Sequence, residues 1–257
     1  MKKLILISID GFRPELIDKK YCQFLHSLSK NSYYSNNVQS VIPPITLPCF
    51  YSIFFGVNPL THGVFYNIIH DDYKVNSPNL FEILSKNNFS CSAYFNWKTL
   101  EKAFGHNNNL VKYFIDDLTI NGDIKMVSLL LENIKSHLPD FIFLYLGALD
   151  EVGHKYKWMS KEYIETAKTV DKLVKILIES LGETYDFIIH SDHGGYEYGH
   201  YVLMKEIMTV PLLFISRNSN NIEFNKKVGI IDIAPTILNY FGINIPINWE
   251  GTPFITK

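Results

Sequence analysis

The sequence predicts an α/β fold in which a mostly parallel sheet carries helices on both faces. Several short runs are continuously apolar, which is typical of strands buried on both sides. Segments with a helical spacing of apolar residues lie between these runs. Strands that alternate with helices favour a sheet between two helical layers. The 257 residues suffice for a sizeable core, and we predict a single domain over 1–257.

The predicted strands end in polar or glycine-rich turns, as strands of a parallel sheet commonly do. The clearest helix runs from a predicted N-cap, Ser160, to Gly182. Residues 96–139 have the least regular pattern, and the polar run 106–109 within them indicates an exposed loop, so we predict a loop or small cap insertion over 96–139. The strands are expected at residues 3–9, 91–95, 140–146, 186–189 and 210–215.

The composition limits the partners and the location that we expect. A formal net charge of −2 disfavours an extended nucleic-acid partner, which requires a basic face. The three cysteines cannot form a disulfide framework and suit a reducing compartment. The first apolar run stops at Asp10 without a cleavage site, and no run approaches the ~20 residues that span a bilayer. We expect a cytoplasmic protein without a membrane partner, and the sequence leaves its oligomeric state open.

Three aspartates each follow a predicted strand, at the edge where α/β sheets collect their ligands. They are Asp10, Asp150 and Asp192. Imidazole side chains accompany two of them. His193 and His200 lie in the glycine-rich segment 188–200, and His154 follows Asp150 by four residues. Three strand ends could therefore converge on one metal centre.

Carboxylate and imidazole groups are ligands that divalent transition metals recruit. One predicted site consists of Asp150, His154 and His200. With three protein ligands, such a site leaves a position open for water or substrate. A second predicted site consists of Asp10, Asp192 and His193. Two adjacent ions suit displacement at phosphorus, because one can activate the attacking oxygen while the other stabilises the leaving oxygen.

The segment 41–54 offers a nucleophile for such a centre. Thr46 follows two prolines and precedes an apolar helical run, which places its hydroxyl at or near a helix N-terminus. The helix dipole and a bound cation would both favour the alkoxide. On spacing alone, an N-cap is the simpler interpretation of this threonine.

Short motifs run along the chain and include the site residues named above. They lie at residues 8–11, 44–48, 62–67, 150–154, 191–194, 199–200, 208–213 and 232–238. Together these motifs resemble the type I phosphodiesterase/nucleotide pyrophosphatase family of the alkaline phosphatase superfamily. The resemblance implies an alkaline-phosphatase-like three-layer sandwich. It also implies hydrolysis of a small-molecule phosphate ester, above all at phosphodiester or nucleotide pyrophosphate bonds.

Carried over by position, the resemblance assigns a role to each site residue. Thr46 would be the nucleophile and form a phosphothreonine intermediate, and Asn67 would donate to a non-bridging phosphoryl oxygen. Two divalent ions are implied; zinc is usual in the family, and manganese or iron also suits oxygen-rich sites. One ion would be held by Asp10, Thr46, Asp192 and His193, and the other by Asp150, His154 and His200.

Three alternative functions are weighed against the phosphodiesterase prediction. A sulfatase needs a formylglycine precursor in a motif with arginine, and Cys49 has no such arginine after it. A phosphomonoesterase needs an extra cation near the phosphate, for which Lys155 and Lys157 are candidates. A metal-binding protein without turnover is disfavoured by Thr46 and Asn67, because a structural site needs neither.

For the other aromatic and histidine residues near the motifs or elsewhere in the chain, we favour a structural role. Aromatic residues that flank the motifs could stack on a substrate, but packing is the commoner role. These are Phe65, Tyr66, Tyr156, Trp158, Tyr196 and Tyr198. The histidines without a place in the metal scheme are His26, His62, His70, His106, His137 and His190.

Overall fold

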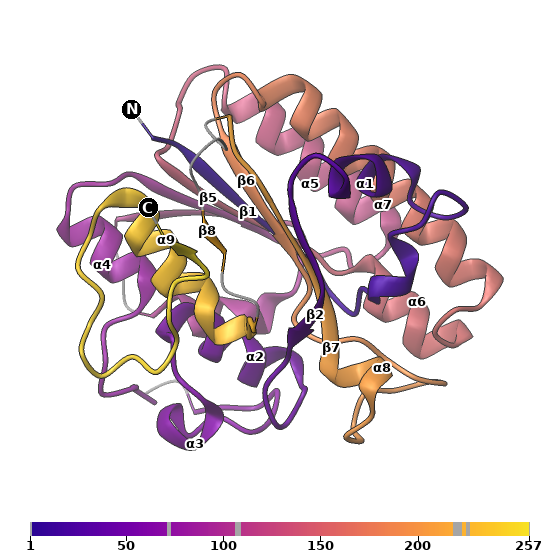
Figure 1. Cartoon of the computed structure of the whole chain (residues 1–257), viewed down its shortest axis with the longest axis horizontal. Helices are drawn as coiled ribbons and strands as arrows, with labels where there is room; N and C mark the ends of the chain where they lie inside the picture. Colours follow the sequence, from indigo (N-terminus) through magenta and orange to yellow (C-terminus); the bar gives the residue numbers. More distant parts are fainter. Residues whose placement is uncertain (1, 71–72, 106–108, 218–222, 225–226, 257) are drawn as a thin grey trace.

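A seven-stranded sheet runs through the middle of the molecule, with helices on both sides (Figure 1). The structure is a computed structural model that describes residues 2–70, 73–105, 109–217, 223–224 and 227–256. In spatial order the strands are β2 (Tyr33–Gln39), β7 (Thr209–Ile215), β6 (Asp186–His190), β1 (Leu4–Ile9), β5 (Phe141–Leu146), β3 (Cys91–Phe95) and β4 (Leu110–Phe114).

Most of the sheet is parallel. The five strands from β6 to β4 pair in parallel, whereas β7 runs antiparallel to both β6 and β2. Strands β1, β5 and β3 are buried at every residue, as their continuous apolar sequences predict. The predicted α/β class with a mostly parallel, helix-covered sheet is confirmed.

The two strands of the main sheet that sequence reasoning missed, β2 and β4, lie at its edges. Strand β2 is mostly polar and half exposed, and β4 has only one fully buried residue. An edge strand pairs on one side only and can keep polar side chains in water, so neither sequence has a continuous apolar run.

Residues 96–139 differ from the prediction. They form the 3₁₀ helix η2 (Lys98–Phe104), strand β4 and helix α5 (Ile120–Asn133). Strand β4 extends the main sheet beside β3, and α5 packs against α7 (Lys161–Leu181). The segment therefore belongs to the sheet and its helical layer and is not a separate loop or cap. Residues 106–108 of the predicted exposed turn lie outside the described residues.

The two faces of the sheet carry separate apolar clusters. Helices α1 (Gln23–Ser29), α5 and α7 cover one face. Helix α7 begins as predicted, because Ser160 Oγ accepts a hydrogen bond from the Tyr163 backbone N–H at 3.2 Å. The opposite face is covered by α2 (Thr46–Phe55), α4 (Leu80–Lys86) and α9 (Ile233–Phe241).

Short elements complete the described chain. A small second sheet pairs β8 (Glu223–Phe224) with β9 (Ile255–Thr256). Within the described ranges, no helix has both the length and the apolarity that crossing a membrane requires. The remaining elements are η1 (Pro14–Leu16), α3 (Pro59–His62), α6 (Ala148–Tyr156), α8 (Lys205–Met208) and η4 (Ile230–Asp232).

Candidate metal centre

The carboxyl ends of three adjacent parallel strands deliver most of the predicted ligands. Asp10 directly follows β1, and Asp192 lies two residues after the end of β6. Asp150 lies in the first turn of α6, which follows β5. Since β1 lies between β6 and β5 in the sheet, these three chain turns meet at one place.

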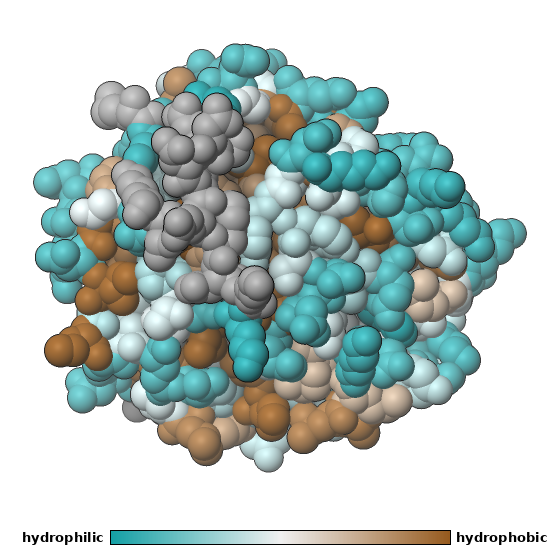
Figure 2. Space-filling model, viewed as in Figure 1, coloured by the Kyte–Doolittle hydropathy of each residue, from teal (hydrophilic) through white to brown (hydrophobic). Residues whose placement is uncertain are grey.

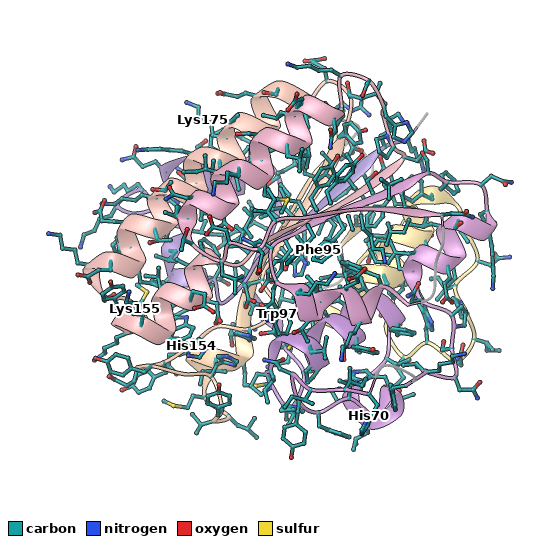
Figure 3. The ribbon with its side chains drawn as sticks, turned by 180° about the vertical axis from the view of Figure 1, so that it is seen from behind. His70, Phe95, Trp97, His154, Lys155 and Lys175 are labelled. Carbon is teal, nitrogen blue, oxygen red and sulfur yellow. The ribbon has the colours of Figure 1, made fainter. Side chains whose placement is uncertain are left out.

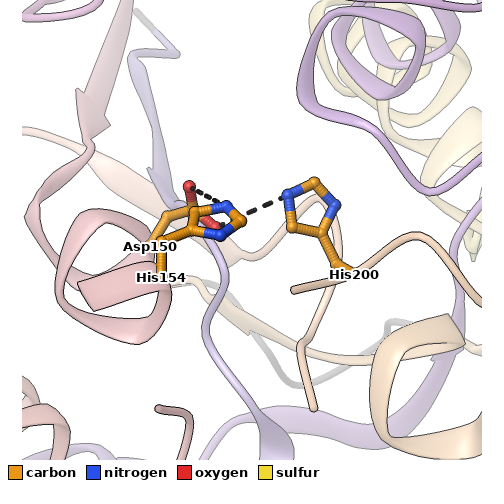
Figure 4. A group of neighbouring side chains, drawn as sticks. All are labelled: Asp150, His154 and His200. Atoms are coloured by element: carbon orange, nitrogen blue, oxygen red, sulfur yellow. Dashed lines mark ion pairs between the residues drawn. The ribbon is translucent and has the colours of Figure 1, made fainter. Parts of the chain in front are cut away.

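One cluster, which we call the open group, consists of Asp150, His154 and His200 (Figure 4). Asp150 and His154 are one helical turn apart in α6, and His154 Nε2 lies 3.4 Å from Asp150 Oδ2. His200 comes from the loop before α8, and its Nε2 lies 3.9 Å from Asp150 Oδ1. The side chains of Asp150 and His154 are 13% and 30% exposed, whereas that of His200 is 2% exposed, so this group reaches solvent through Asp150 and His154.

The second cluster, which we call the buried group, consists of Asp10, Asp192 and His193. His193 Nε2 lies 3.4 Å from both Asp10 Oδ1 and Asp192 Oδ2, and all three residues are buried. The turn after β1 is tied to the turn after β6, because the Phe12 N–H donates to Ser191 Oγ at 2.9 Å. The strand ends themselves thus hold this group together.

The three histidines are oriented in the same way. Each Nδ1 lies within hydrogen-bonding distance of a backbone carbonyl oxygen: Tyr198 O for His154, Gly194 O for His193 and Pro44 O for His200, at 2.9, 2.9 and 2.7 Å. A carbonyl only accepts, so each Nδ1 donates, and Nε2 is the ring nitrogen that faces the carboxylates. This is the arrangement in which an outer hydrogen bond orients a metal-binding imidazole.

The carboxylates have oxygens without a hydrogen-bond partner. Among the buried side-chain atoms of the described residues, Asp10 Oδ1, Asp150 Oδ1 and Asp192 Oδ2 are unpartnered. Each of these atoms lies 3.4 to 3.9 Å from a histidine Nε2. Lone pairs of carboxylate and imidazole that face one another in a buried site need a proton or a metal cation between them. The donor set therefore fits bound metal ions.

The electrostatics agree with that fit. Burial, followed by repulsion from Asp192 and Asp150, raises the pKa of Asp10 well above its usual value. Burial likewise raises the pKa of Asp192 to about 7. The hydrogen bond that His154 donates to Asp150 raises the pKa of His154 to about 9, whereas burial lowers that of His200 to about 3. A divalent cation would relieve the cost of burying these carboxylates as anions.

Thr46 lies beside the buried group. It is the first residue of α2, and Ile45 is the N-cap residue, so the Thr46 hydroxyl does not cap the helix. Thr46 Oγ1 instead lies 3.2 Å from His193 Nε2. Every residue of α2 is buried, so packing on the sheet holds the Thr46 end of the helix in place. The alternative reading of Thr46 as an N-cap is wrong.

Asn67 reaches the same place from the loop after α3. Its Oδ1 accepts a hydrogen bond from the Leu47 N–H at 2.9 Å, which leaves its amide N–H groups available to donate. His62 holds the start of this loop, since its Nδ1 accepts from the Val64 N–H and its Nε2 lies 2.9 Å from Ser52 Oγ. The structural role predicted for His62 is therefore borne out by its contacts.

A cavity of about 140 Å³ opens onto these residues. Thr46 and Asn67 line it together with Asp10 and the whole open group. Figure 3 shows His154 and Trp97, another lining residue, near each other at the end of the sheet. The other lining residues are Leu118, Tyr145, Gly147, Glu151 and Tyr201.

The two candidate cations for a phosphomonoesterase lie elsewhere. Lys157 forms a 2.7 Å ion pair with Glu197, and Lys155 lies over the Tyr156 ring. Among the described residues that line the cavity, none is lysine or arginine, and Glu151 adds a carboxylate.

The loops around the cavity carry exposed apolar side chains. Ile68 and Tyr66 flank Asn67 and are 88% and 70% exposed, and residues 201–203 after His200 are more than half exposed. Figure 2 shows hydrophobic side chains along the lower edge of the molecule, in the region of α3 and the loop before α8. Of the flanking aromatics named from the sequence, Trp158 is buried, while Tyr66, Tyr156, Tyr196 and Tyr198 are exposed.

Sequence reasoning missed residues that support the ligands from a distance. The Tyr145 hydroxyl donates to Asp10 Oδ2. Asp123 of α5 accepts from the Ala148 N–H at 3.3 Å and from Asn96 Nδ2 at 2.8 Å, so it caps α6, which carries two ligands. Only the inward-facing position of Tyr145 on a buried strand could have signalled such a role.

The fold and this site define an α/β protein with two neighbouring carboxylate–histidine clusters at the carboxyl edge of its sheet. Residues 4–236 match the family model described as type I phosphodiesterase/nucleotide pyrophosphatase. The chain belongs to this family.

Curated relatives agree with the family assignment. Ectonucleotide pyrophosphatase/phosphodiesterase family member 1 of Homo sapiens is 31% identical over 217 residues, covering 74% of this chain and 23% of that protein. Ectonucleotide pyrophosphatase/phosphodiesterase 1 of Saccharomyces cerevisiae is 26% identical over 327 residues, covering 96% of this chain and 43% of that protein. The chain spans between 23% and 31% of the length of the first four curated relatives.

A solved structure shares the fold. An inactive variant of murine ectonucleotide pyrophosphatase/phosphodiesterase 5, in complex with AMP, superposes with a TM-score of 0.78 at 14% identity. The match covers 97% of this chain and 98% of the murine chain. The predicted alkaline-phosphatase-like sandwich is therefore confirmed.

Proposed function

We propose that the chain is a hydrolase of phosphodiester or nucleotide pyrophosphate bonds that uses two divalent ions and Thr46 as its nucleophile. The observation that carries this proposal is the Thr46 hydroxyl, 3.2 Å from His193 of the buried group and free of any capping role. A protein that only binds metal has no need for a hydroxyl held there.

Each residue has a distinct task in the proposed reaction. Thr46 Oγ1 attacks phosphorus, the bond to the leaving oxygen breaks, and a phosphothreonine forms that water then hydrolyses. Asn67 donates its amide N–H to a non-bridging phosphoryl oxygen, a contribution of the kind whose loss costs roughly 10²- to 10³-fold in rate. Bound ions would favour the alkoxide and balance the charge that develops on the phosphoryl group.

The ion types follow from the donor atoms. The two clusters combine three imidazole nitrogens with carboxylate oxygens and contain no thiolate, a set that suits zinc, manganese or iron. We propose one zinc ion in each cluster. Thr46 Oγ1 would complete the buried group, while the open group, with three protein ligands, leaves a position for substrate or water.

The cavity favours a diester over a monoester. A phosphodiester carries one negative charge at neutral pH, and a monoester carries up to two. The described cavity wall offers no lysine or arginine for the second charge and contains Glu151. These features support a phosphodiesterase and disfavour the phosphomonoesterase alternative. A cytoplasmic location and the lack of a membrane partner rest on composition and stay predictions.

The test compares two chromogenic substrates on metal-stripped protein to which zinc or manganese is restored. We expect hydrolysis of bis-p-nitrophenyl phosphate to exceed that of p-nitrophenyl phosphate and to depend on metal. Thr46→Ala should abolish turnover, whereas the control Thr166→Ala, at a half-buried position of α7, should not. Preference for the monoester, or full turnover by Thr46→Ala, would overturn the proposal.

A further inference from the structure

Trp158 lies at the junction of the three chain segments that carry the metal-site residues. Its indole Nε1 donates to Gly11 O at 2.9 Å, in the turn that holds Asp10. Its backbone N–H donates to Glu197 O at 2.8 Å, in the loop between His193 and His200. The residue is 2% exposed and lies two residues after the end of α6, so it connects all three segments from within the protein interior.

The indole ring packs against two glycines, Gly153 and Gly195, whose lack of a side chain leaves room for it. A Cβ atom on Gly153 would lie 2.7 Å from the ring, and one on Gly195 would lie 2.0 Å from it. Gly153 precedes His154 in α6, and Gly195 lies two residues after His193. Because neither position tolerates a Cβ beside the indole, α6 and the loop after β6 both approach the ring as closely as backbone allows.

The ring also contacts both histidines of the open group. The Trp158 and His154 ring centroids are 5.0 Å apart in an edge-on arrangement, and the Trp158 and His200 centroids are 6.1 Å apart. Gly11 meets the same group from the other side, since a Cβ there would lie 3.0 Å from Asp150 Oδ1. The indole thus contacts both histidines of the open group and donates a hydrogen bond to Gly11, the residue after Asp10 of the buried group.

The backbone around Trp158 is strained. Lys157 and Met159, its two neighbours, have φ values of +84° and +64°, and Glu197 has +52°. Residues with side chains rarely adopt these values, and such strain persists where the surroundings over-determine the conformation. The backbone is strained on both sides of the buried indole. The surrounding contacts therefore hold the indole in one place against the cost of that strain.

We propose that Trp158 is a positioning residue that sets the mutual orientation of the buried and open groups. It acts through Gly11, Gly153 and the two histidines and does not touch substrate. The inference rests on the proposed function, because it assumes that both groups hold metal. Its consequence is that loss of the indole lowers metal affinity, beyond any general effect on stability.

The experiment compares Trp158→Phe with Trp249→Phe in the full chain. Trp249 is a matched control, because its ring is also buried and its Nε1 donates to Ser77 Oγ at 3.2 Å, away from the ligands. Zinc binding is measured by competition with a chromophoric chelator. We expect Trp158→Phe to weaken zinc binding by about 10- to 100-fold, as loss of an outer partner does, and Trp249→Phe to leave it unchanged. Unchanged zinc affinity in Trp158→Phe, or an equal loss in both variants, would overturn the inference.

A second measurement covers the case in which Trp158→Phe does not fold. The chain has three tryptophans, so the double variant Trp97→Phe/Trp249→Phe leaves Trp158 as the sole tryptophan. Its emission should change in step with bound zinc or manganese, and a constant emission would overturn the inference. If the wild type binds neither metal, the proposed function fails, whereas binding by the wild type with an unaltered Trp158→Phe refutes only the positioning role.

Discussion

The buried and open groups are built in different ways from the same kinds of side chain. The buried group lies on two turns that follow adjacent parallel strands, and its three residues are buried. The open group combines one turn of α6 with a loop residue, and its Asp150 and His154 are partly exposed. The difference teaches that a sheet edge can supply a rigid site, while a helix and a loop beside it supply one that solvent and substrate can enter.

The largest effect is expected from the buried group. Asp192→Asn keeps the shape of the side chain but removes a buried negative charge, and water has little room to replace the lost ligand. We expect turnover to fall by more than the roughly 100-fold that loss of an outer partner produces. Metal content should fall by one ion per chain. Full metal content in Asp192→Asn, measured by mass spectrometry beside the exposed control Asp116→Asn, would show that Asp192 is no ligand.

A smaller effect is expected from the open group. Because the His154 side chain is 30% exposed, water can take its place on an ion. His154→Gln should therefore lower metal affinity by roughly 10- to 100-fold, and excess zinc should restore part of the turnover. A loss as complete as that of Asp192→Asn, with no recovery at high zinc, would remove the distinction between the two groups.

The open and buried groups should release metal at different rates. A chelator added to the zinc-loaded chain reaches the solvent-facing open group first, so we expect a fast and a slow phase of zinc release. Stopped-flow measurement with a chromophoric chelator should show that His154→Gln speeds the fast phase and that Asp192→Asn lacks the slow one. A single phase in the wild type would mean that exposure does not govern release.

The smallest effect is expected from Asp123, which supports the start of α6 by accepting from the Ala148 N–H. Burial raises the pKa of Asp123 to about 7, above the value near 3.9 of an unfolded chain. Its contribution to stability is therefore present below about pH 3.9 and is lost as the pH rises through about 7. Asp123→Asn cannot ionise, so its free energy of unfolding should fall less than that of the wild type over this range. Urea unfolding at several pH values checks this, and parallel profiles for the two proteins would contradict it.

The two candidate ligand groups could be predicted from sequence because the rule that brings their residues together is local. Asp10 and Asp192 follow apolar strands, and His154 follows Asp150 at the spacing of one helical turn. The edge strands β2 and β4 could not be predicted, because strands half in water lose the apolar signal.

The contacts that support the candidate ligands could not be predicted from sequence for a different reason than the edge strands. Trp158 reaches Gly11 across 147 positions of the sequence, and Asn96 reaches Asp123 across 27. Such contacts depend on how the layers pack, which no short motif encodes. The role of Trp158 also depends on the missing side chains of Gly153 and Gly195, which allow the ring to approach the backbone.

The most direct test of the two-ion account is a zinc titration of the metal-stripped chain that records bound zinc and bis-p-nitrophenyl phosphate hydrolysis together. The account predicts that hydrolysis rises only as both ligand groups fill and reaches its maximum at two ions per chain. Full hydrolysis without metal, or with one ion bound, would contradict it.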